Sequence, residues 1–548
     1  MNFRKSLYQV SLVTIMAISA VNTQAQGVVP AQKGDKTFTL EDLNFGGNNY
    51  RNMVAKNRWC TWWGDQLVRQ NVDACYLVNK TNGKETKLFG INDINQWIAP
   101  TKDVKVRALY NARFPFAGKS IVMVSNGGKT YTVDFRKHRL ISELEFQEGE
   151  NLLEANTQQN AFAYLKGSNL YVRTFNAAPE NAMTKEKKSH DFQLSADGSR
   201  EIVYGQSVHR DEFGISKGTF WSPNGERLAF YRMDQSMVTD YPQVNIPEIG
   251  FDHPETQSCI ATPAPDKYPM AGETSHQVTV GVFDCLTGKT IYLKAGDPTD
   301  RYFTNIAWSP DSKTVYMFEV NRDQNDSSLT AYDAETGEKT GELYRETDEK
   351  YVEPLHPIMF LPWDSNRFIM QSRKDGYNHL YLCTLGKHGS RMASNTESLD
   401  IRQLTSGKWE VMEVLGFNRK RKSIIIASNE CSPIQRNIFL VDAQTGKRTM
   451  MDDCGKGWHN ATLSESGQFV YDNYSTPDVP RKIAIVNTEN GKRTAYFTAE
   501  NPWKGYNVPE YSCGTVKAAD GETDLYWRMV KPTNFDPAKK YPTIIYVY

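Results

Sequence analysis

The sequence predicts an all-β protein built around a β-propeller. A unit with two alternating turn markers recurs along most of its 548 residues. One marker is a Ser-Pro-Asp/Asn turn, followed by Gly in its clearest copy, and the other is an Asp-x-x-x-Gly turn. A period of roughly 40–50 residues with four short strands is typical of propeller blades. The aromatic share of 12% agrees with this, because aromatic side chains pack well on strands.

The first 25 residues predict a signal peptide. A charged start, Arg4-Lys5, precedes the apolar run Ser6–Val21, and Ala25 follows as a small residue suited to cleavage. We therefore expect an exported protein that is periplasmic, attached to the cell surface or secreted. Residues 26–60 form an N-terminal segment before the repeats. No later segment is apolar and long enough to predict a membrane span.

The charge balance excludes several classes of function. Lys and Arg number 64, as do Asp and Glu, so the formal net charge is zero. A zero balance argues against a surface for nucleic acid or a polybasic membrane patch. The hydrophobic share of 39% is enough for packed cores and too high for a disordered chain.

The cysteines predict no metal or redox chemistry. Eight are present, and eight allow 105 pairings that the sequence does not choose between. No CxxC or HExxH motif occurs, so we expect no metal and no cofactor. In an exported protein we expect free buried cysteines together with one or two bridges.

The Asp marker gives the period. A short apolar strand ends in Asp or Asn, and Gly follows four places later, as expected for a tight hairpin. The spacings between the glycines of successive copies are 49, 109 and 45 residues. The spacing of 109 residues corresponds to two repeats, with a degenerate copy of the marker near Gly386. The four clear copies begin at Asp284, Asp333, Asp442 and Asn487.

The Ser marker opens each unit. Clear copies begin at Ser222 and Ser309, and weaker ones occupy Leu194–Gly198 and Leu463–Gly467. The earlier part, Trp62 to Phe135, predicts short strands with turns, among them Asn92–Asn95 and Asn126–Gly128. Seven or eight blades fit between roughly residues 60 and 500. We expect eight, in a propeller domain over residues 61–500.

The pattern changes after residue 500. Ser512–Ala518 and Thr523–Lys531 predict two strands around an Asp-Gly turn. The apolar run Thr543–Tyr548 predicts a fully buried strand. We therefore expect residues 501–548 to be the incomplete start of a second domain.

Two short patterns bear on chemistry. Gly214–Gly218 matches G-x-S-x-G, but Ser216 lacks the preceding strand and following helix that a nucleophile elbow needs, so we interpret it as a coincidence. Asp211 and Glu212 are adjacent acids. Their ordinary interpretation is a solvated loop, and the functional alternative is a carboxylate placed to bind a cation.

Seven longer motifs resemble the dipeptidyl peptidase IV family of serine exopeptidases. Among its members the likeness is strongest to bacterial prolyl tripeptidyl peptidases, and it runs from about residue 50 to the last residue. The motifs are Trp59–Gly64, His209–Ile215, Phe230–Ser236, Tyr268–Gly272, Asn321–Asn325, Asp375–Tyr381 and Leu404–Val411.

The resemblance implies an eight-bladed propeller capping an α/β-hydrolase domain. Peptide substrates with proline near the N-terminus would lie between the two domains. Glu212 would bind the substrate ammonium, with Asp211 beside it. Dipeptidyl members use two adjacent Glu, so the Asp-Glu pair leaves removal of Xaa-Pro or of Xaa-Xaa-Pro open. An Arg that dipeptidyl peptidase IV supplies earlier in the propeller has no match between Ile121 and Tyr131.

Tyr548 matches the family tyrosine that helps form the oxyanion hole. The Ser, Asp and His of the triad would follow it and are absent from the sequence. The resemblance thus implies the N-terminal part of a longer enzyme, with a homodimer possible for the full-length protein. The alternative is a non-catalytic propeller that binds peptides or proteins. A structural envelope propeller, the third hypothesis, explains neither the acidic pair nor the segment after residue 540.

Overall fold

The computed structural model describes six parts of the chain, and most of their regular secondary structure is β-strand. The predicted signal peptide up to residue 23 lies outside them, and so does Tyr548. In the described parts, no helix has the length and apolar character needed to cross a membrane. The described residues are 24–98, 105–175, 189–246, 260–386, 399–452 and 456–547.

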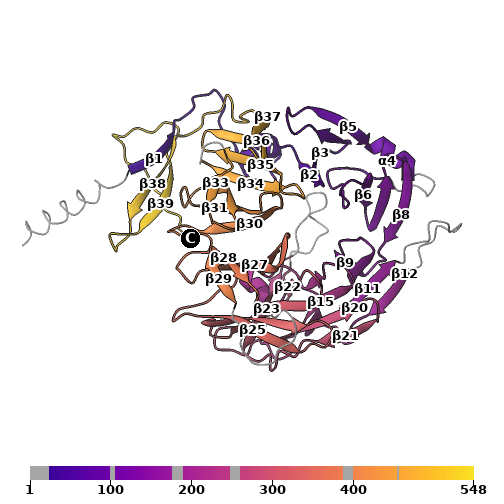
Figure 1. The fold of residues 1–548 in the computed structure, drawn as a ribbon. Coiled ribbons are helices and arrows are strands. Elements are labelled where there is room, and N and C mark those ends of the chain that lie inside the picture. Colours follow the sequence, from indigo (N-terminus) through magenta and orange to yellow (C-terminus); the bar gives the residue numbers. More distant parts are fainter. Residues whose placement is uncertain are drawn as a thin grey trace, which may run out of the picture.

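Eight antiparallel sheets follow one another over the described residues between Cys60 and Thr498. Figure 1 shows them arranged in a ring, in the order of the chain. Consecutive strands are neighbours in seven of these sheets, which are simple meanders; in the fourth sheet, the first two strands both pair with the third.

The first four sheets include one with three strands and one with five. They contain β2 (Cys60–Trp63), β3 (Gln66–Gln70), β4 (Ala74–Val78) and β5 (Glu85–Gly90); β6 (Ile121–Asn126), β7 (Lys129–Asp134) and β8 (Arg139–Glu145); β9 (Glu150–Ala155), β10 (Ala161–Lys166), β11 (Asn169–Phe175) and β12 (Ser189–Gln193); and β13 (Ile202–Tyr204), β14 (Thr219–Trp221), β15 (Arg227–Asp234), β20 (Gln277–Asp284) and β21 (Lys289–Tyr292).

The last four sheets have four strands each. They contain β22 (Arg301–Trp308), β23 (Thr314–Asn321), β24 (Asp326–Asp333) and β25 (Lys339–Thr347); β26 (Met359–Leu361), β27 (Asp364–Ser372), β28 (His379–Thr384) and β29 (Asp400–Gln403); β30 (Val411–Asn418), β31 (Ser423–Ser428), β32 (Asn437–Asp442) and β33 (Arg448–Met450); and β34 (Trp458–Leu463), β35 (Phe469–Thr476), β36 (Val479–Asn487) and β37 (Arg493–Thr498).

The remaining elements lie outside this series. Two small ribbons extend from the fourth sheet, and a third sheet joins the two ends of the chain. Three short α-helices and a 3₁₀ segment complete the described fold. These elements are β16 (Asp240–Tyr241) with β19 (Asp266–Lys267), β17 (Val244–Asn245) with β18 (Thr262–Pro263), β1 (Gln24–Val29) with β38 (Tyr511–Lys517) and β39 (Asp524–Val530), α2 (Leu40–Leu43), α3 (Tyr50–Met53), α4 (Ile91–Ile98) and η2 (His209–Gly214).

The Asp marker forms the turn between the third and fourth strands of four sheets, as predicted. In the Asp333 copy, the carboxylate Oδ1 accepts hydrogen bonds from the amides of Glu335 and Thr336 at 2.9 and 2.8 Å. The Gly337 amide donates to the Asp333 carbonyl at 2.9 Å. Gly337 has a φ of 75°, a conformation in which a side chain is costly.

The Ser marker closes the turn between the first and second strands. The Oγ atoms of Ser222, Ser309 and Ser464 each accept a hydrogen bond from the amide five residues ahead, at 2.9–3.1 Å. The weaker copy at Leu194–Gly198 was predicted wrongly. Ser195 instead follows the last strand of the third sheet, where its Oγ accepts from the Leu170 amide at 2.9 Å.

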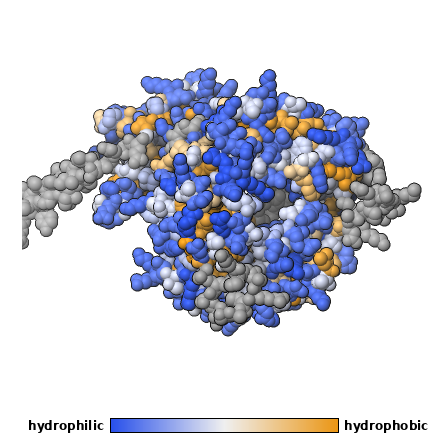
Figure 2. Space-filling model, viewed as in Figure 1, coloured by the Kyte–Doolittle hydropathy of each residue, from blue (hydrophilic) through white to orange (hydrophobic). Residues whose placement is uncertain are grey.

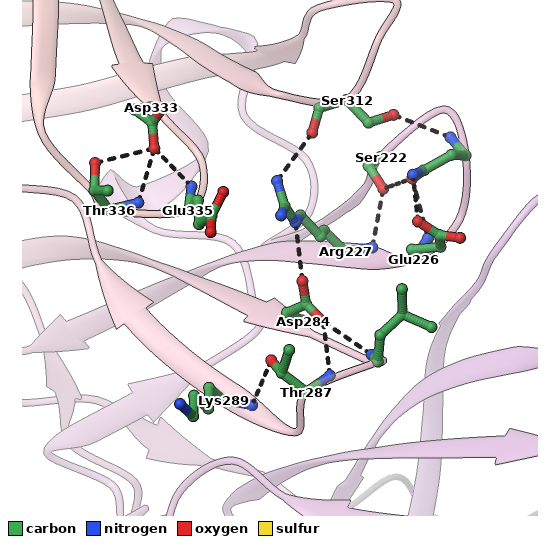
Figure 3. Close-up of polar contacts among 12 residues, drawn as sticks. Ser222, Glu226, Arg227, Asp284, Thr287, Lys289, Ser312, Asp333, Glu335 and Thr336 are labelled. Carbon is green, nitrogen blue, oxygen red and sulfur yellow. Dashed lines mark hydrogen bonds and ion pairs between the residues drawn. The ribbon is translucent and has the colours of Figure 1, made fainter.

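Markers of neighbouring sheets also contact one another. The Asn224 amide of the fourth sheet donates to Ser312 Oγ of the fifth at 3.1 Å. Within the fourth sheet, Arg227 donates to Asp284 Oδ2 at 3.1 Å (Figure 3). Arg227 also reaches the Ser312 carbonyl at 3.4 Å. The same motif thus shapes each turn and links the fourth sheet to the fifth.

The core is divided among the joints between sheets. Strand β31 is buried along its whole length. Ile424 and Ile426 pack against the sixth sheet, whereas Ile425 packs against the eighth. Since alternate side chains of a strand point to opposite faces, each sheet needs a neighbour on both sides. Seven of the eight joints contain such a cluster among the described residues.

The first and last sheets close the ring. Leu67 of β3 packs with Tyr471 of β35. Asp65 Oδ1 accepts from the amide and hydroxyl of Ser466 at 3.0 and 2.8 Å. The Tyr496 hydroxyl donates to Glu85 at 2.7 Å. The first sheet therefore contacts the last sheet, although about 400 residues separate them in the sequence.

Two predictions about local structure were wrong. Asn92–Asn95 belongs to α4 rather than to a turn. The helix forms because Ile94 and Ile98, one helical turn apart, are both buried in the first core cluster. Residues 543–547 form no strand, and Ile544 is 94% exposed. The described chain places no neighbouring strand beside this segment to pair with it or to bury it.

Five of the described cysteines are free thiols. Cys60, Cys75, Cys285, Cys383 and Cys513 are unpaired. Burial raises the pKa of the Cys75 thiol to about 12, which keeps it protonated and unreactive. Cys259 and Cys454 lie outside the described residues.

A buried charged network joins the strands of the eighth sheet. His459 Nδ1 contacts Asp472 Oδ1 at 2.9 Å, and His459 Nε2 contacts the Lys456 carbonyl at 2.9 Å. Both partners are acceptors, so both ring nitrogens must donate and the ring is an imidazolium. Arg493 also donates to Asp472 at 2.9 Å. Burial opposes the charge, but the Asp472 hydrogen bond and charge raise the pKa of His459.

Replacing Asp333 by Ala should destabilise the protein by about 1–2 kcal/mol, because three local hydrogen bonds to its carboxylate are lost. Urea unfolding would measure the change. The matched control is Glu335→Ala in the same turn, whose exposed side chain should matter little. Equal loss in both variants would contradict the role given to the Asp marker.

Stability should fall as the pH rises above about 6.5, the ordinary His value. The folded pKa of His459 is raised, so its stabilising contribution is complete below the unfolded pKa and disappears as the pH passes the folded pKa. Urea midpoints from pH 6 to pH 9 would test this. His459→Gln cannot gain the charge, so its profile should be flatter than the wild-type profile; parallel profiles would refute the assignment.

Candidate functional site

The candidate site begins with a break in the first strand of the fourth sheet. β13 and β14 both pair with β15, and the chain between them leaves the sheet as a loop, residues 205–218. Both ends of the loop are fixed on one residue of β15. The Gly205 amide donates to the Tyr231 carbonyl at 2.9 Å, and the Tyr231 amide donates to the Gly218 carbonyl at 3.0 Å. The predicted acidic pair lies in this loop.

The backbone of the loop is strained. His209, Arg210, Asp211 and Phe213 have φ values of 53°, 55°, 64° and 57°. Non-glycine residues rarely adopt this left-handed region, and such positions persist only where the surroundings enforce them. Glu212 alone among them is extended, with φ −59° and ψ 161°.

The sheets around the loop enforce this conformation. Phe213 is 3% exposed, and its carbonyl accepts from the Asn305 side-chain amide at 3.1 Å. Asn305 lies in a β-bulge of β22. A Cβ atom on Gly214 would lie 2.4 Å from the Leu355 carbonyl oxygen, so only glycine fits there. Elements of the fifth sheet and of its connection to the sixth therefore hold the loop.

This backbone geometry places the two acidic side chains in different surroundings. Asp211 accepts a hydrogen bond from the Ser207 hydroxyl and does not line the neighbouring cavity. Glu212 does line it, and its carboxylate forms no ion pair or side-chain hydrogen bond with another described residue. The cavity has a volume of about 940 Å³.

Three predicted motifs meet at this cavity. Glu212 comes from the 3₁₀ segment, Tyr268 from the arm that returns to β20, and Arg322 from the turn between β23 and β24. The motifs of Tyr268 and Arg322 were singled out by resemblance alone, whereas the Asp211–Glu212 pair was also noted as two adjacent acids that could bind a cation. Trp62, from another motif, instead closes the ring by donating to Thr462 Oγ1 at 3.1 Å. Ser216 is followed by the strand β14 and not by a helix, which supports its dismissal as a nucleophile.

The cavity carries mixed charge. Its lining includes four carboxylates (Glu212, Glu273, Asp300 and Asp323) and two guanidiniums (Arg210 and Arg322). Arg210 pairs with Asp266 at 2.7 Å and lies over the Tyr268 ring at 4.3 Å. Arg322 donates to the Tyr302 hydroxyl at 2.9 Å. The excess of carboxylates favours a cationic ligand group.

Two histidines next to Glu212 were missed at the sequence level. His209 and His276 are 2% and 4% exposed, and their Nδ1 and Nε2 atoms lie 2.8 Å apart. Burial and the Arg322 charge lower the pKa of His276 to about 4. Burial, His276 and Arg322 lower the pKa of His209 well below its usual value. Their separation of 67 positions left no local signal.

No other reactive centre appears in the described ranges. They hold no cluster of three His, Cys, Asp or Glu side chains placed to bind a metal ion. A second cavity of about 800 Å³ is lined by Trp221, Trp308 and Trp363. Trp308 Nε1 donates to the Phe220 carbonyl at 2.9 Å, so this ring serves to link two sheets. The visible face of the molecule is largely hydrophilic (Figure 2).

Comparison with known proteins gives a consistent result. Residues 117–481 match the family model of the dipeptidyl peptidase IV N-terminal region. The chain is 25% identical over 472 residues to a probable dipeptidyl-aminopeptidase B of Phaeosphaeria nodorum, covering 78% of this chain and 48% of that protein. The chain thus spans about half the length of the curated relatives it matches.

Two solved structures are similar. The crystal structure of a putative dipeptidyl aminopeptidase IV from Bacteroides ovatus shares 44% identity with a TM-score of 0.82, covering 94% of this chain and 70% of that one. Dipeptidyl peptidase 4 of Porphyromonas gingivalis, at 20% identity, shares the fold with a TM-score of 0.69, covering 93% and 69% of the two chains. The family match covers well over half of the sequence, and the chain therefore belongs to the dipeptidyl peptidase IV family.

Proposed function

We propose that this chain supplies the substrate-binding propeller of an exported serine exopeptidase that removes short peptides ending in proline from peptide N-termini. The observation that carries the proposal is Glu212, which a strained loop presents to a cavity while its carboxylate has no partner among the described residues. In this proposal, the eight sheets are the eight blades, and residues 501–548 begin the hydrolase domain.

The chemistry of the proposed site is recognition of the substrate N-terminus. A carboxylate pairs with the ammonium through charge-assisted hydrogen bonds, which are stronger than neutral ones. The distance from Glu212 to the nucleophile would then determine how many residues are released. Tyr548 keeps its proposed role in the oxyanion hole, while the triad would come from sequence beyond residue 548.

The number of residues released is a finer part of the proposal. The relatives are named as dipeptidyl aminopeptidases, which supports removal of two residues. The Asp211–Glu212 pair supports a change in substrate length, because Asp211 is bound to Ser207 and only Glu212 of the pair lines the cavity. Both Xaa-Pro and Xaa-Xaa-Pro substrates therefore belong in the test.

Glu212→Gln should weaken binding of peptides with a free N-terminus about tenfold, because the charged partner of the ammonium is removed. Calorimetric titration of the 548-residue chain with a proline-containing peptide and its N-acetylated form would measure this. Asp211→Asn is the matched control and should change affinity less than about twofold. Unchanged discrimination between the two peptides in Glu212→Gln would refute the proposed site.

The catalytic part of the proposal needs a second experiment. The chain and a form lengthened by the downstream coding sequence would be given chromogenic Xaa-Pro and Xaa-Xaa-Pro substrates. We expect cleavage by the longer form alone. Cleavage by the 548-residue chain that a serine-directed inhibitor abolishes would contradict our dismissal of Ser216. Peptide binding without cleavage in either form would favour the non-catalytic binding propeller.

A further inference from the structure

A strained loop holds its shape only if its neighbours enforce it. Four non-glycine residues of the Glu212 loop lie in the left-handed region, at a cost of about 1 kcal/mol or more for each. The hydrogen bonds at the base of the loop fix both of its ends, and the contacts of Phe213 fix its interior. His209 is the first of these four residues, and its side chain fixes the start of the strained part.

The hydrogen bonds of His209 define its tautomer. The Phe303 amide of β22 can only donate, and it contacts His209 Nε2 at 3.3 Å. Nε2 is therefore the acceptor, and the ring proton of neutral His209 resides on Nδ1. Nδ1 then donates to His276 Nε2 at 2.8 Å. His276 in turn must be neutral with its own proton on Nδ1, since a proton on its Nε2 would face the Nδ1 proton of His209.

The groups around the pair keep it neutral. Arg322 approaches from the turn after β23, and Arg210 approaches from the loop itself; both disfavour a charged His276. Tyr302 of β22 packs its ring edge-on against His209, with centroids 4.9 Å apart. No described carboxylate forms an ion pair with either histidine. The pair is thus a buried neutral hydrogen bond between the loop and the residue that immediately precedes β20.

We propose that the His209–His276 pair is a positioning device that fixes the strained loop, so that Glu212 faces the cavity and captures the substrate ammonium. The inference rests on the proposed function of Glu212. The histidines touch the loop rather than the reacting groups, so they act through Glu212. The essential feature is the acceptor at His276 Nε2, which keeps the hydrogen bond from His209 while the fifth sheet holds the other side of the ring.

The test compares substitutions that keep or remove this acceptor. In His276→Gln the side-chain amide oxygen can take the place of Nε2, whereas His276→Leu has no acceptor. The exposed His190 of β12 gives a matched control, His190→Leu. The probe is the tetrapeptide amide Ala-Ala-Pro-Ala, free and N-acetylated, titrated calorimetrically into the 548-residue chain.

We expect His276→Leu to lose about tenfold in affinity for the free peptide, with the affinity for the acetylated peptide unchanged. His276→Gln and His190→Leu should retain the wild-type ratio of the two affinities. An unchanged ratio in His276→Leu would overturn the proposal. So would an equal loss in His276→Gln, because the acceptor would then not be the essential feature.

Two controls separate this inference from the function on which it rests. If Glu212→Gln leaves the ratio unchanged, the proposed function fails; if only Glu212→Gln alters it, the positioning role alone fails. Circular dichroism melting checks that each variant is folded. Should His276→Leu not fold, His276→Asn replaces it, because its shorter amide cannot reach His209. Retention of the wild-type ratio in His276→Asn would equally overturn the proposal.

Discussion

Closure of the ring is the constraint on which the rest of the fold depends. Each sheet is buried on both faces by its neighbours, as Ile424 and Ile425 show on one strand. The first and last sheets share no strand, so contacts between turns and side chains close this joint. These are the Leu67 cluster, the Asp65 and Glu85 hydrogen bonds, and a bond from the Glu465 amide to the Gly64 carbonyl. Opening it would expose two sheet faces to water, a large loss of apolar burial.

A closed ring explains how the strained loop can exist. The loop leaves the fourth sheet, but Asn305 of the fifth sheet and Leu355 of the next connection hold it from outside. None of these contacts is local in sequence. Strain of this kind needs neighbours that cannot move away, and sheets fixed on both faces provide them. The site therefore lies at a joint between sheets.

The sequence allowed prediction of what short-range chemistry determines. The Asp333 and Ser309 turns are closed by hydrogen bonds within five residues, so their motifs were sufficient. Prediction failed where distant contacts decide. Burial in a core cluster makes Asn92–Asn95 helical, and a similar motif at Ser195 serves a connection between sheets. Glu212 was noted as one of two adjacent acids and received its role by resemblance, whereas the His209–His276 contact depends wholly on the tertiary arrangement.

The two adjacent acids show how backbone geometry distinguishes residues of similar chemistry. Asp211 has a left-handed φ of 64°, and Glu212 is extended, so their side chains diverge. The Ser207 hydroxyl satisfies Asp211, while Glu212 joins a cavity in which carboxylates outnumber guanidiniums. Such a cavity favours an ammonium group over a carboxylate. In the proposed function, a peptide would therefore enter by its N-terminus, and its C-terminal direction would lead away from Glu212.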